Sequence, residues 1–135
     1  MIGLAVDLVL AVFGLFFLYT GVVSFLRPEP FARALSLEAV GRSGAVEIRA
    51  QYGGFFFAAA LSQFAALCDL MAPFGALMVA LVIFGGLILG RLGSFVFGTG
   101  GQALTPTIRA LFLIDGGGAV VAAACLLLAT PVAGI

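Results

Sequence analysis

The sequence has no histidine, no lysine and very little charge of either sign. Six arginines balance six acidic residues among 135 positions, so 9% of the chain is charged and 64% is hydrophobic, with a mean hydropathy of +1.31. Soluble domains carry about 25% charged residues, and a chain this apolar cannot cover its surface in water. We therefore expect a membrane protein. The zero net charge offers no basic patch for nucleic acid.

The absences also limit the chemistry. Histidine is the side chain most used as a general base and as a transition-metal ligand, and this chain has none. The sequence also contains no phosphate-binding loop, dinucleotide fingerprint, zinc-protease motif or nucleophile elbow. We predict no catalytic residues, no metal site and no cofactor, although whether the protein is an enzyme stays open. Cys68 and Cys125 are expected to be buried apolar residues.

Four hydrophobic segments are long enough to cross a bilayer, because a hydrocarbon core about 30 Å thick needs about 20 apolar residues of helix. Arg27-Pro28 closes the first segment, Pro73 opens the third, and Thr105-Pro106 opens the fourth. The predicted spans are residues 2–26, 45–68, 73–97 and 106–130. Since open strand edges are unstable in lipid, we predict an all-α membrane protein, a single domain over residues 1–135 that forms a bundle of four transmembrane helices.

The connections carry the arginines. Three lie in the first connection and three at span ends on the same side of the predicted membrane: Arg27, Arg33, Arg42, Arg49, Arg91 and Arg109. Cytoplasmic loops carry the excess of arginine and lysine, so we expect both termini on the non-cytoplasmic side. Arginine as the only base, with abundant alanine, glycine and valine, is typical of a GC-rich bacterial genome, which favours the bacterial inner membrane. Residues 31–40 are expected to form a short surface helix, and residues 98–104 a glycine turn.

Small and polar residues recur on one face of several spans, since residues three and four apart share a helix face. In the second span this face is Glu47, Gln51, Gly54, Ala58, Ser62, Ala65 and Asp69. In the first it is Gly3, Asp7, Gly14 and Gly21, in the fourth Asp115, Gly118, Ala122 and Ala129, and in the third Gly75, Gly86, Gly90 and Gly93. Small residues let helices approach closely in lipid. We expect the faces of the first, second and fourth spans to meet, with Glu47 and Gln51 turned inward.

Several charged residues are expected at the same depth in the inner leaflet of the membrane. Asp115 lies about 12 Å inside the fourth span, Arg91 lies about two turns inside the third span, and Glu47 and Arg49 stand near the start of the second. We predict an inner-leaflet ionic cluster of Glu47, Arg49, Gln51, Tyr52, Arg91 and Asp115. The favoured interpretation is a structural clamp that keeps helices in register. The alternatives are a pocket for a headgroup, quinone or small solute, or charges that face a partner subunit.

Several motifs carry a resemblance to a known family. EIRAQYGG at residues 47–54, FGGLILGRLGS at 84–94, FLRPE at 25–29 and an acid in the fourth span together resemble a bacterial membrane family catalogued as domain of unknown function 4345. The matching positions are Glu47, Arg49, Tyr52, Gly53, Gly54, Gly90 and Arg91, whereas Asp115 stands where a glutamate is expected. The resemblance implies a small four-helix inner-membrane protein with no assigned activity. The general plan is also similar to DoxX-like membrane proteins, some linked to quinone or thiol oxidation, but that likeness is architectural only.

Two functions from different classes follow. We favour an accessory or assembly subunit that packs against a larger membrane complex, because fourteen phenylalanines offer surface for lipids and partner helices. The alternative is a membrane-embedded binder, carrier or quinone-linked oxidoreductase that uses Glu47, Arg49, Arg91 and Asp115. The expected partners are membrane lipids and other membrane subunits or further copies of the chain.

Overall fold

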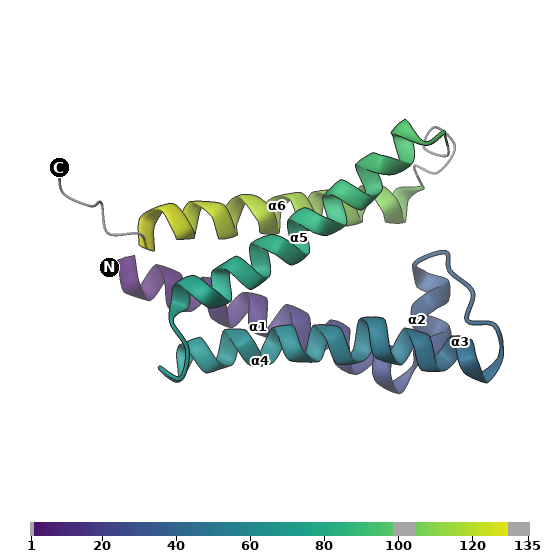
Figure 1. Cartoon of the computed structure of the whole chain (residues 1–135), viewed down its shortest axis with the longest axis horizontal. Helices are drawn as coiled ribbons and strands as arrows, with labels where there is room; N and C mark the ends of the chain where they lie inside the picture. The colour runs from purple at the N-terminus through teal and green to yellow at the C-terminus, as the bar shows by residue number, and fades with distance from the viewer. Residues whose placement is uncertain (1, 99–104, 130–135) are drawn as a thin grey trace. The chain divides into compact units, whose positions relative to one another are not determined.

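The computed structural model describes residues 2–98 and 105–129, and every element within these ranges is helical (Figure 1). The elements are α1 (Ile2–Leu26), α2 (Pro28–Ala34), α3 (Gly41–Ile48), η1 (Arg49–Gly54), α4 (Phe55–Leu67), α5 (Pro73–Val96) and α6 (Pro106–Ala129). Three helical stretches are long and apolar enough to cross a membrane: Gly3–Leu26, Pro73–Val96 and Pro106–Ala129. The all-α class is thereby confirmed for the described residues, and the three stretches, which overlap three of the predicted spans, indicate a multi-pass membrane protein.

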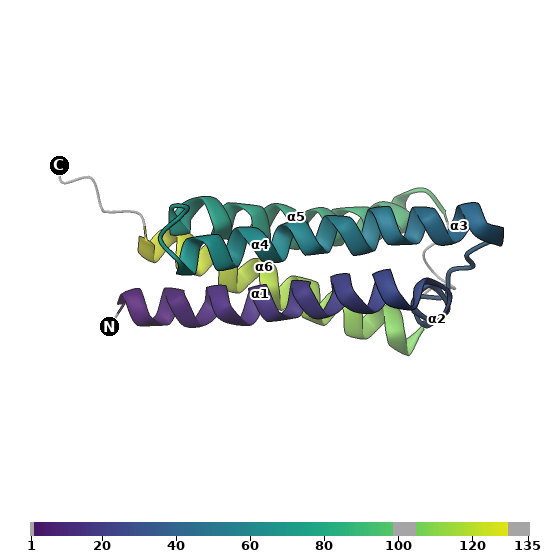
Figure 2. The ribbon, with the colours of Figure 1, turned by 90° about the horizontal axis from the view of Figure 1, so that it is seen from below.

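The segment predicted as the second span, residues 45–68, consists of three contiguous helical elements. α3 runs directly into η1, a π-helix of six residues, and η1 runs directly into α4 (Figure 2). A π-helix forms its hydrogen bonds between residues five apart and so holds more residues per turn than an α-helix. Every side chain after η1 is therefore rotated relative to the face that a regular α-helix would give it.

Helix ends follow the local residues. Pro28, Pro73 and Pro106 each occupy the first position of a helix, where the missing N–H costs nothing and the fixed φ fits the helix. The Ile108 N–H donates to Thr105 Oγ1 at 3.3 Å, so the predicted N-cap of the fourth span is confirmed. Residues 99–104 of the predicted glycine turn and residue 130 of the predicted fourth span lie outside the described residues.

The surface helix predicted at residues 31–40 is misplaced. α2 begins at Pro28 and ends at Ala34, because Ser36 adopts a left-handed φ of 60°. The Leu37 N–H donates to Ala32 O at 2.9 Å and the Ser36 N–H to Arg33 O at 2.9 Å. These two hydrogen bonds form a Schellman motif, which satisfies the last carbonyl groups and terminates the helix.

The chain divides into two compact units. The α1–α4 unit comprises residues 10–71, and the α5–α6 unit comprises residues 1–9 and 72–135. In the α1–α4 unit, a β-carbon added at Gly14 would lie 2.8 Å from the Phe64 ring. One added at Gly21 would lie 3.0 Å from the Phe57 backbone nitrogen and 3.2 Å from Gly53 O. The two antiparallel backbones therefore touch at Gly21, where only glycine fits.

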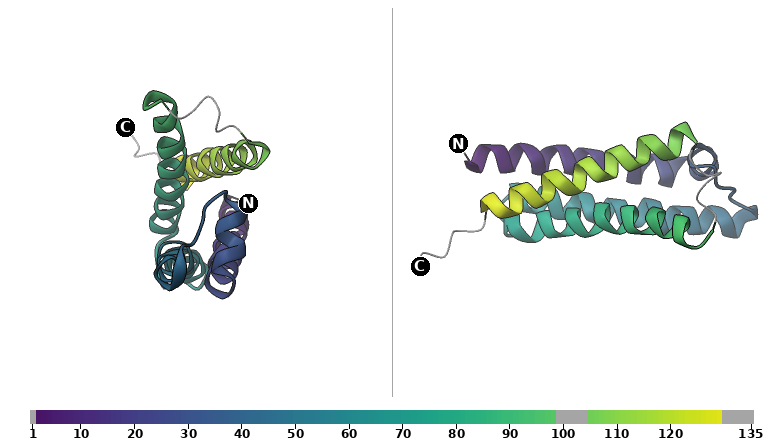
Figure 3. Two further views of the ribbon diagram at one scale, coloured as in Figure 1. Left: turned by 90° about the vertical axis from the view of Figure 1, so that its right-hand side faces the viewer. Right: turned by 90° about the horizontal axis from the view of Figure 1, so that it is seen from above.

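In the α5–α6 unit the two long helices run in opposite directions and cross (Figure 3). A β-carbon added at Gly118 of α6 would lie 2.7 Å from the Phe84 ring of α5. The Ile88 side chain comes within 3.8 Å of the corresponding position at Gly116. Bulky residues of α5 thus pack on the small face of α6, as efficient van der Waals contact in lipid requires.

The small-residue rule identifies the buried face correctly on only part of the helices. Four predicted interior positions of α1 and α6 are buried: Gly14, Gly21, Asp115 and Ala122. Gly3 and Asp7 are exposed. For α5 the sequence predicts no interior face; its buried residues are Ala76, Leu77, Ala80, Ile83 and Phe84. Space opposite glycines is filled by large side chains, so a helix that packs on a small face buries its own bulky one.

In the second predicted span the buried face differs from the predicted one. The buried residues of η1 and α4 are Gly53, Phe56, Ala59, Ala60, Gln63 and Ala66, whereas Glu47, Gln51, Gly54 and Ala58 are exposed. The prediction that Glu47 and Gln51 turn inward is therefore wrong: the face that they share with Gly54 and Ala58 is the exposed face of this helical run, and a different face is buried. Cys68 is also exposed, while Cys125 is buried as expected; both thiols are free.

Replacing Gly21 with alanine tests the contact between the two backbones. Gly21→Ala should destabilise the protein by about 1–3 kcal/mol, because the added methyl overlaps the backbone of η1 and α4. Gly86→Ala is the matched control, since among the described residues nothing lies within 4 Å of its added β-carbon, and it should stabilise by about 0.5–1 kcal/mol through helix propensity. Thermal unfolding in detergent measures both. Equal effects of the two substitutions would contradict the close approach at Gly21.

Candidate functional site

The π-helical element η1 coincides with most of the EIRAQYGG motif. It contains RAQYGG, from Arg49 to Gly54, and so includes three of the six predicted site residues. π-helical turns are rare and occur frequently at functional sites. Side-chain contacts attach η1 to α1 and α2.

Arg49 caps the carboxyl end of α1. Its Nε donates to Phe25 O at 3.0 Å, one of the carbonyl groups that a helix leaves without a backbone partner in its last turn. A guanidinium at this end also interacts favourably with the helix dipole. Beside this bond, a β-carbon added at Gly53 would lie 3.0 Å from the Phe25 ring. Arg49 and Gly53 together fix the end of α1 against η1.

Tyr52 attaches α2 to the same element. Its ring meets Phe31 of α2 edge to face, with centroids 5.3 Å apart, and stacks on Phe56 of α4 at 6.4 Å. Aromatic pairs in these arrangements contribute about 0.5–1.5 kcal/mol beyond the area they bury. Tyr52 therefore has a packing role in the structure, and its contacts hold α2 over η1.

Glu47 and Gln51 form a local pair on the exposed side of the helix. Gln51 Nε2 donates to Glu47 Oε2 at 3.1 Å. Both side chains are exposed, so this hydrogen bond contributes little to stability. These residues and Arg49 all make their polar contacts within the α1–α4 unit.

Arg91 and Asp115 form an ion pair between α5 and α6. Arg91 Nη1 donates to Asp115 Oδ2, and the two side chains are 20% and 4% exposed. The Arg91 guanidinium also lies 5.8 Å from the centroid of the Phe112 ring, a cation–π distance. A carboxylate inside a spanning helix is costly unless it is paired, and Arg91 supplies the partner.

The six predicted site residues thus fall into two groups. Arg91 and Asp115 are brought together in the α5–α6 unit. Glu47, Arg49, Gln51 and Tyr52 belong to the α1–α4 unit, where Glu47 contacts Gln51 and Arg49 contacts the end of α1. The single cluster that would join both groups stays a prediction. Among residues 2–98 and 105–129, no group of three or more histidine, cysteine, aspartate or glutamate residues is arranged to hold a metal ion.

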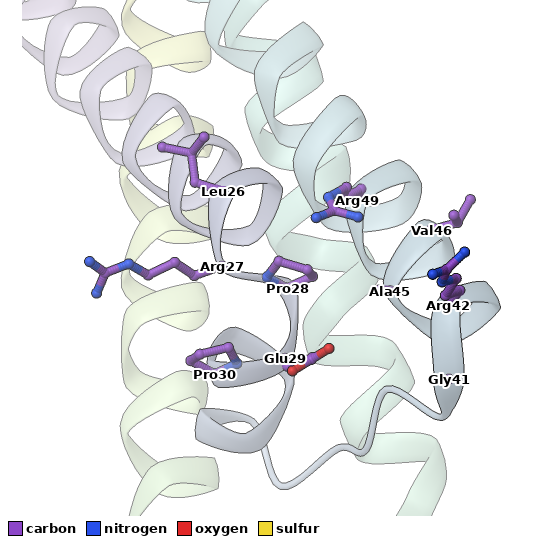
Figure 4. Close-up of a pocket in the computed structure, with 10 residues that line it drawn as sticks. All are labelled: Leu26, Arg27, Pro28, Glu29, Pro30, Gly41, Arg42, Ala45, Val46 and Arg49. Carbon is purple, nitrogen blue, oxygen red and sulfur yellow. The ribbon is translucent and has the colours of Figure 1, made fainter.

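A cavity of about 980 Å³ opens where α1 ends, and the sequence interpretation did not identify it. We call it the arginine pocket and define it by Arg27, Glu29, Arg42 and Arg49, with Leu26 and Val46 among its apolar lining residues. Figure 4 shows these side chains around the start of α2 and the α3–η1 wall. The sequence feature that indicates such a pocket is the concentration of arginine in the first connection, which also predicts the orientation. The fold adds that Arg27 and Arg42 of this connection line one cavity with Arg49 of η1, whereas Arg33 does not line it.

Substituting the ion pair tests its role in stability. Arg91→Leu should destabilise the protein by about 3–5 kcal/mol, because it leaves the Asp115 carboxylate buried without a partner. The double variant Arg91→Leu/Asp115→Leu should be closer to wild type than the sum of the single variants, since it removes both charges. Thermal unfolding of the single and double variants in detergent gives the coupling. Arg109→Leu, at an exposed position of α6, serves as control. Additive single effects would contradict a direct interaction.

The comparisons with known proteins give a family and no activity. No curated protein and no solved structure matches the chain. The family described as Domain of unknown function (DUF4345) matches residues 5–113, which include all of the motifs from FLRPE to the arginine of α5. The resemblance inferred from those motifs is confirmed: the chain belongs to this family.

Proposed function

We propose that the protein is a non-catalytic accessory or assembly subunit that packs against a larger complex in the bacterial inner membrane. The observation that supports this function is an apolar groove on the α1–α4 unit. The groove has a volume of about 420 Å³ and is lined by Phe25, Gly53, Gly54, Phe57, Ala58 and Leu61. Helices in lipid associate where small residues let their backbones approach. The groove therefore fits a transmembrane helix of another subunit.

Gly54 gives this proposal a second support. It is exposed, and a β-carbon added there would meet Arg49 O at 3.8 Å, an ordinary van der Waals contact. No contact within the described chain therefore requires glycine at this position. Glycine inside a helix costs roughly 0.5–1 kcal/mol relative to alanine. Because Gly54 also lines the apolar groove, a close approach by a helix of another protein accounts for glycine at this position.

The run from α3 through η1 to α4 supplies a fourth span in this proposal. Gly14 and Gly21 of α1 face Phe64 and Gly53, so the η1–α4 part of this run lies beside a helix that is itself long enough to cross the membrane. Four spans place both termini on one side. The arginines of the first connection place that connection in the cytoplasm by the positive-inside rule, and both termini on the opposite side.

The Arg91–Asp115 pair has a structural role in this proposal, as a clamp between α5 and α6. The alternative, a membrane-embedded carrier or quinone-linked oxidoreductase, requires both residues to share one site with Glu47 and Arg49. Arg91 and Asp115 instead neutralise each other inside one unit, and paired charges of this kind can specify helix arrangement. The clamp therefore explains the pair without a ligand.

Cysteine labelling tests the fourth span. The exposed Cys68 follows α4, and the exposed Ser43 lies in α3. A membrane-impermeant maleimide should label Cys68 in intact spheroplasts. Ser43→Cys, made in a Cys68→Ala background, should be labelled only after the membrane is permeabilised, because the two positions lie on opposite sides. Labelling of both positions from the same side would show that this run does not cross the membrane.

Purification from the native membrane tests the accessory role. In mild detergent, native mass spectrometry should detect the chain with a different polypeptide in fixed stoichiometry. Ala58→Leu should abolish this complex by filling the groove, whereas Gly86→Leu, at an exposed position of α5, should preserve it. A monomer would contradict the proposal. A homodimer would contradict it as well, and its loss in Ala58→Leu would identify the groove as a self-association surface.

A further inference from the structure

The arginine pocket carries an excess of positive charge. Three arginines and one glutamate line it, which leaves a formal excess of two positive charges. Among the described residues, no carboxylate lies within ion-pair distance of Arg27, Arg42 or Arg49. Figure 4 shows Arg42 and Arg49 on the wall formed by α3 and η1, with Glu29 pointing toward that wall and Arg27 extending to the other side. The charges of the pocket are thus available to an external anion.

Arg49 is held in place while most of its donors stay available. Its Nε is bound to Phe25 O, and a guanidinium has four further N–H groups on its two terminal nitrogens. The carboxyl end of α1 would otherwise repel an anion, and the bond from Arg49 offsets that field. Arg42 stands in the first turn of α3, a helix whose N-cap residue makes no side-chain capping bond, so the helix dipole there also favours negative charge.

The shape and position of the pocket indicate a lipid as the source of the anion. Leu26 and Val46 line the cavity and are 71% and 57% exposed, so an apolar surface adjoins the charged one. Leu26 is also the last residue of a helix long enough to cross the membrane, which puts the pocket at the level of the headgroups. Free phosphate would use the arginines and gain nothing from the apolar surface.

We propose that the arginine pocket binds the phosphate headgroup of an anionic phospholipid. Guanidinium groups bind phosphate oxygens with paired hydrogen bonds, and basic pockets beside spanning helices on the cytoplasmic side recognise anionic headgroups. Arg42 and Arg49 hold the phosphate, and the acyl chains leave along Leu26 and Val46. The Arg27 side chain extends away from both arginines in Figure 4, so it adds only long-range attraction. Glu29 weakens the attraction for the anion. This site does not depend on the proposed accessory role.

Titration of the purified full-length protein in a neutral detergent tests the site. The probes are short-chain phosphatidylglycerol, short-chain phosphatidylcholine and inorganic phosphate, and the readouts are the unfolding temperature and the lipid retained in native mass spectrometry. Phosphatidylglycerol should bind and raise the unfolding temperature, whereas the other two probes should have little effect. Equal binding of phosphatidylcholine would overturn the role of charge, and an equal effect of inorganic phosphate would overturn the lipid as occupant.

Four variants separate a defined site from general surface charge. Arg42→Gln should weaken phosphatidylglycerol binding by about fivefold and Arg27→Gln should weaken it less, while the α1 cap made by Arg49 stays intact. Arg33→Gln is the matched control, an exposed arginine of α2 that does not line the pocket, and it should bind as wild type does. Glu29→Gln should strengthen binding, an effect that loss of folding cannot produce. Equal weakening by Arg33→Gln, no gain from Glu29→Gln, or no binding to wild type would each overturn the proposal.

Discussion

In each of the two units, a phenylalanine ring lies directly on a glycine of the neighbouring helix. Phe64 covers Gly14 in one unit and Phe84 covers Gly118 in the other. Lipid tails are as apolar as the side chains, so burial gives helices little reason to associate, and close van der Waals contact is the main attraction left to them. A ring on a glycine maximises that contact because no β-carbon holds the helices apart. The positions of the polar groups depend on this packing, since it sets which helix faces meet.

The π-helical turn carries the residues that attach α1 and α2 to the rest of their unit. Where α1 reaches η1, Gly21 and Gly53 bring the two backbones together, and the wider turn brings Arg49 to the end of α1. The same turn presents Tyr52 to α2, which fixes the short helix that forms one side of the arginine pocket. The motif EIRAQYGG therefore encodes an attachment point for α1 and α2 as well as part of a membrane helix.

Helix ends were predictable because single residues determine them locally: Pro73, and the Thr105-Pro106 cap, need no knowledge of the rest of the chain. The Arg91–Asp115 pair was foreseeable for a similar reason, since a charge inside a spanning helix needs a partner. The buried faces of α4 and α5 were not predictable from small residues alone, because a glycine can either face a neighbour or be covered by a ring from it. The π-turn and the left-handed Ser36 were also missed. Ser36 ends α2 through the local hydrogen bonds of a Schellman motif, and the π-turn changes the number of residues per turn. A count of three and four residues along the sequence contains neither feature.

The two sets of charge in the structure differ in how they are neutralised, and this difference separates their roles. Arg91 and Asp115 satisfy each other between two spanning helices, so the pair has a defined partner before any ligand arrives and is best understood as a constraint on α5 and α6. Among the described residues, no carboxylate forms an ion pair with Arg27 or Arg42, and Arg49 uses one of its N–H donors for a bond to the end of α1. Three exposed guanidinium groups line one cavity with a single carboxylate, so the cavity attracts anions. At the end of a spanning helix, the anions always at hand are the phosphates of the bilayer, so the membrane that surrounds the protein also supplies the missing counter-charge.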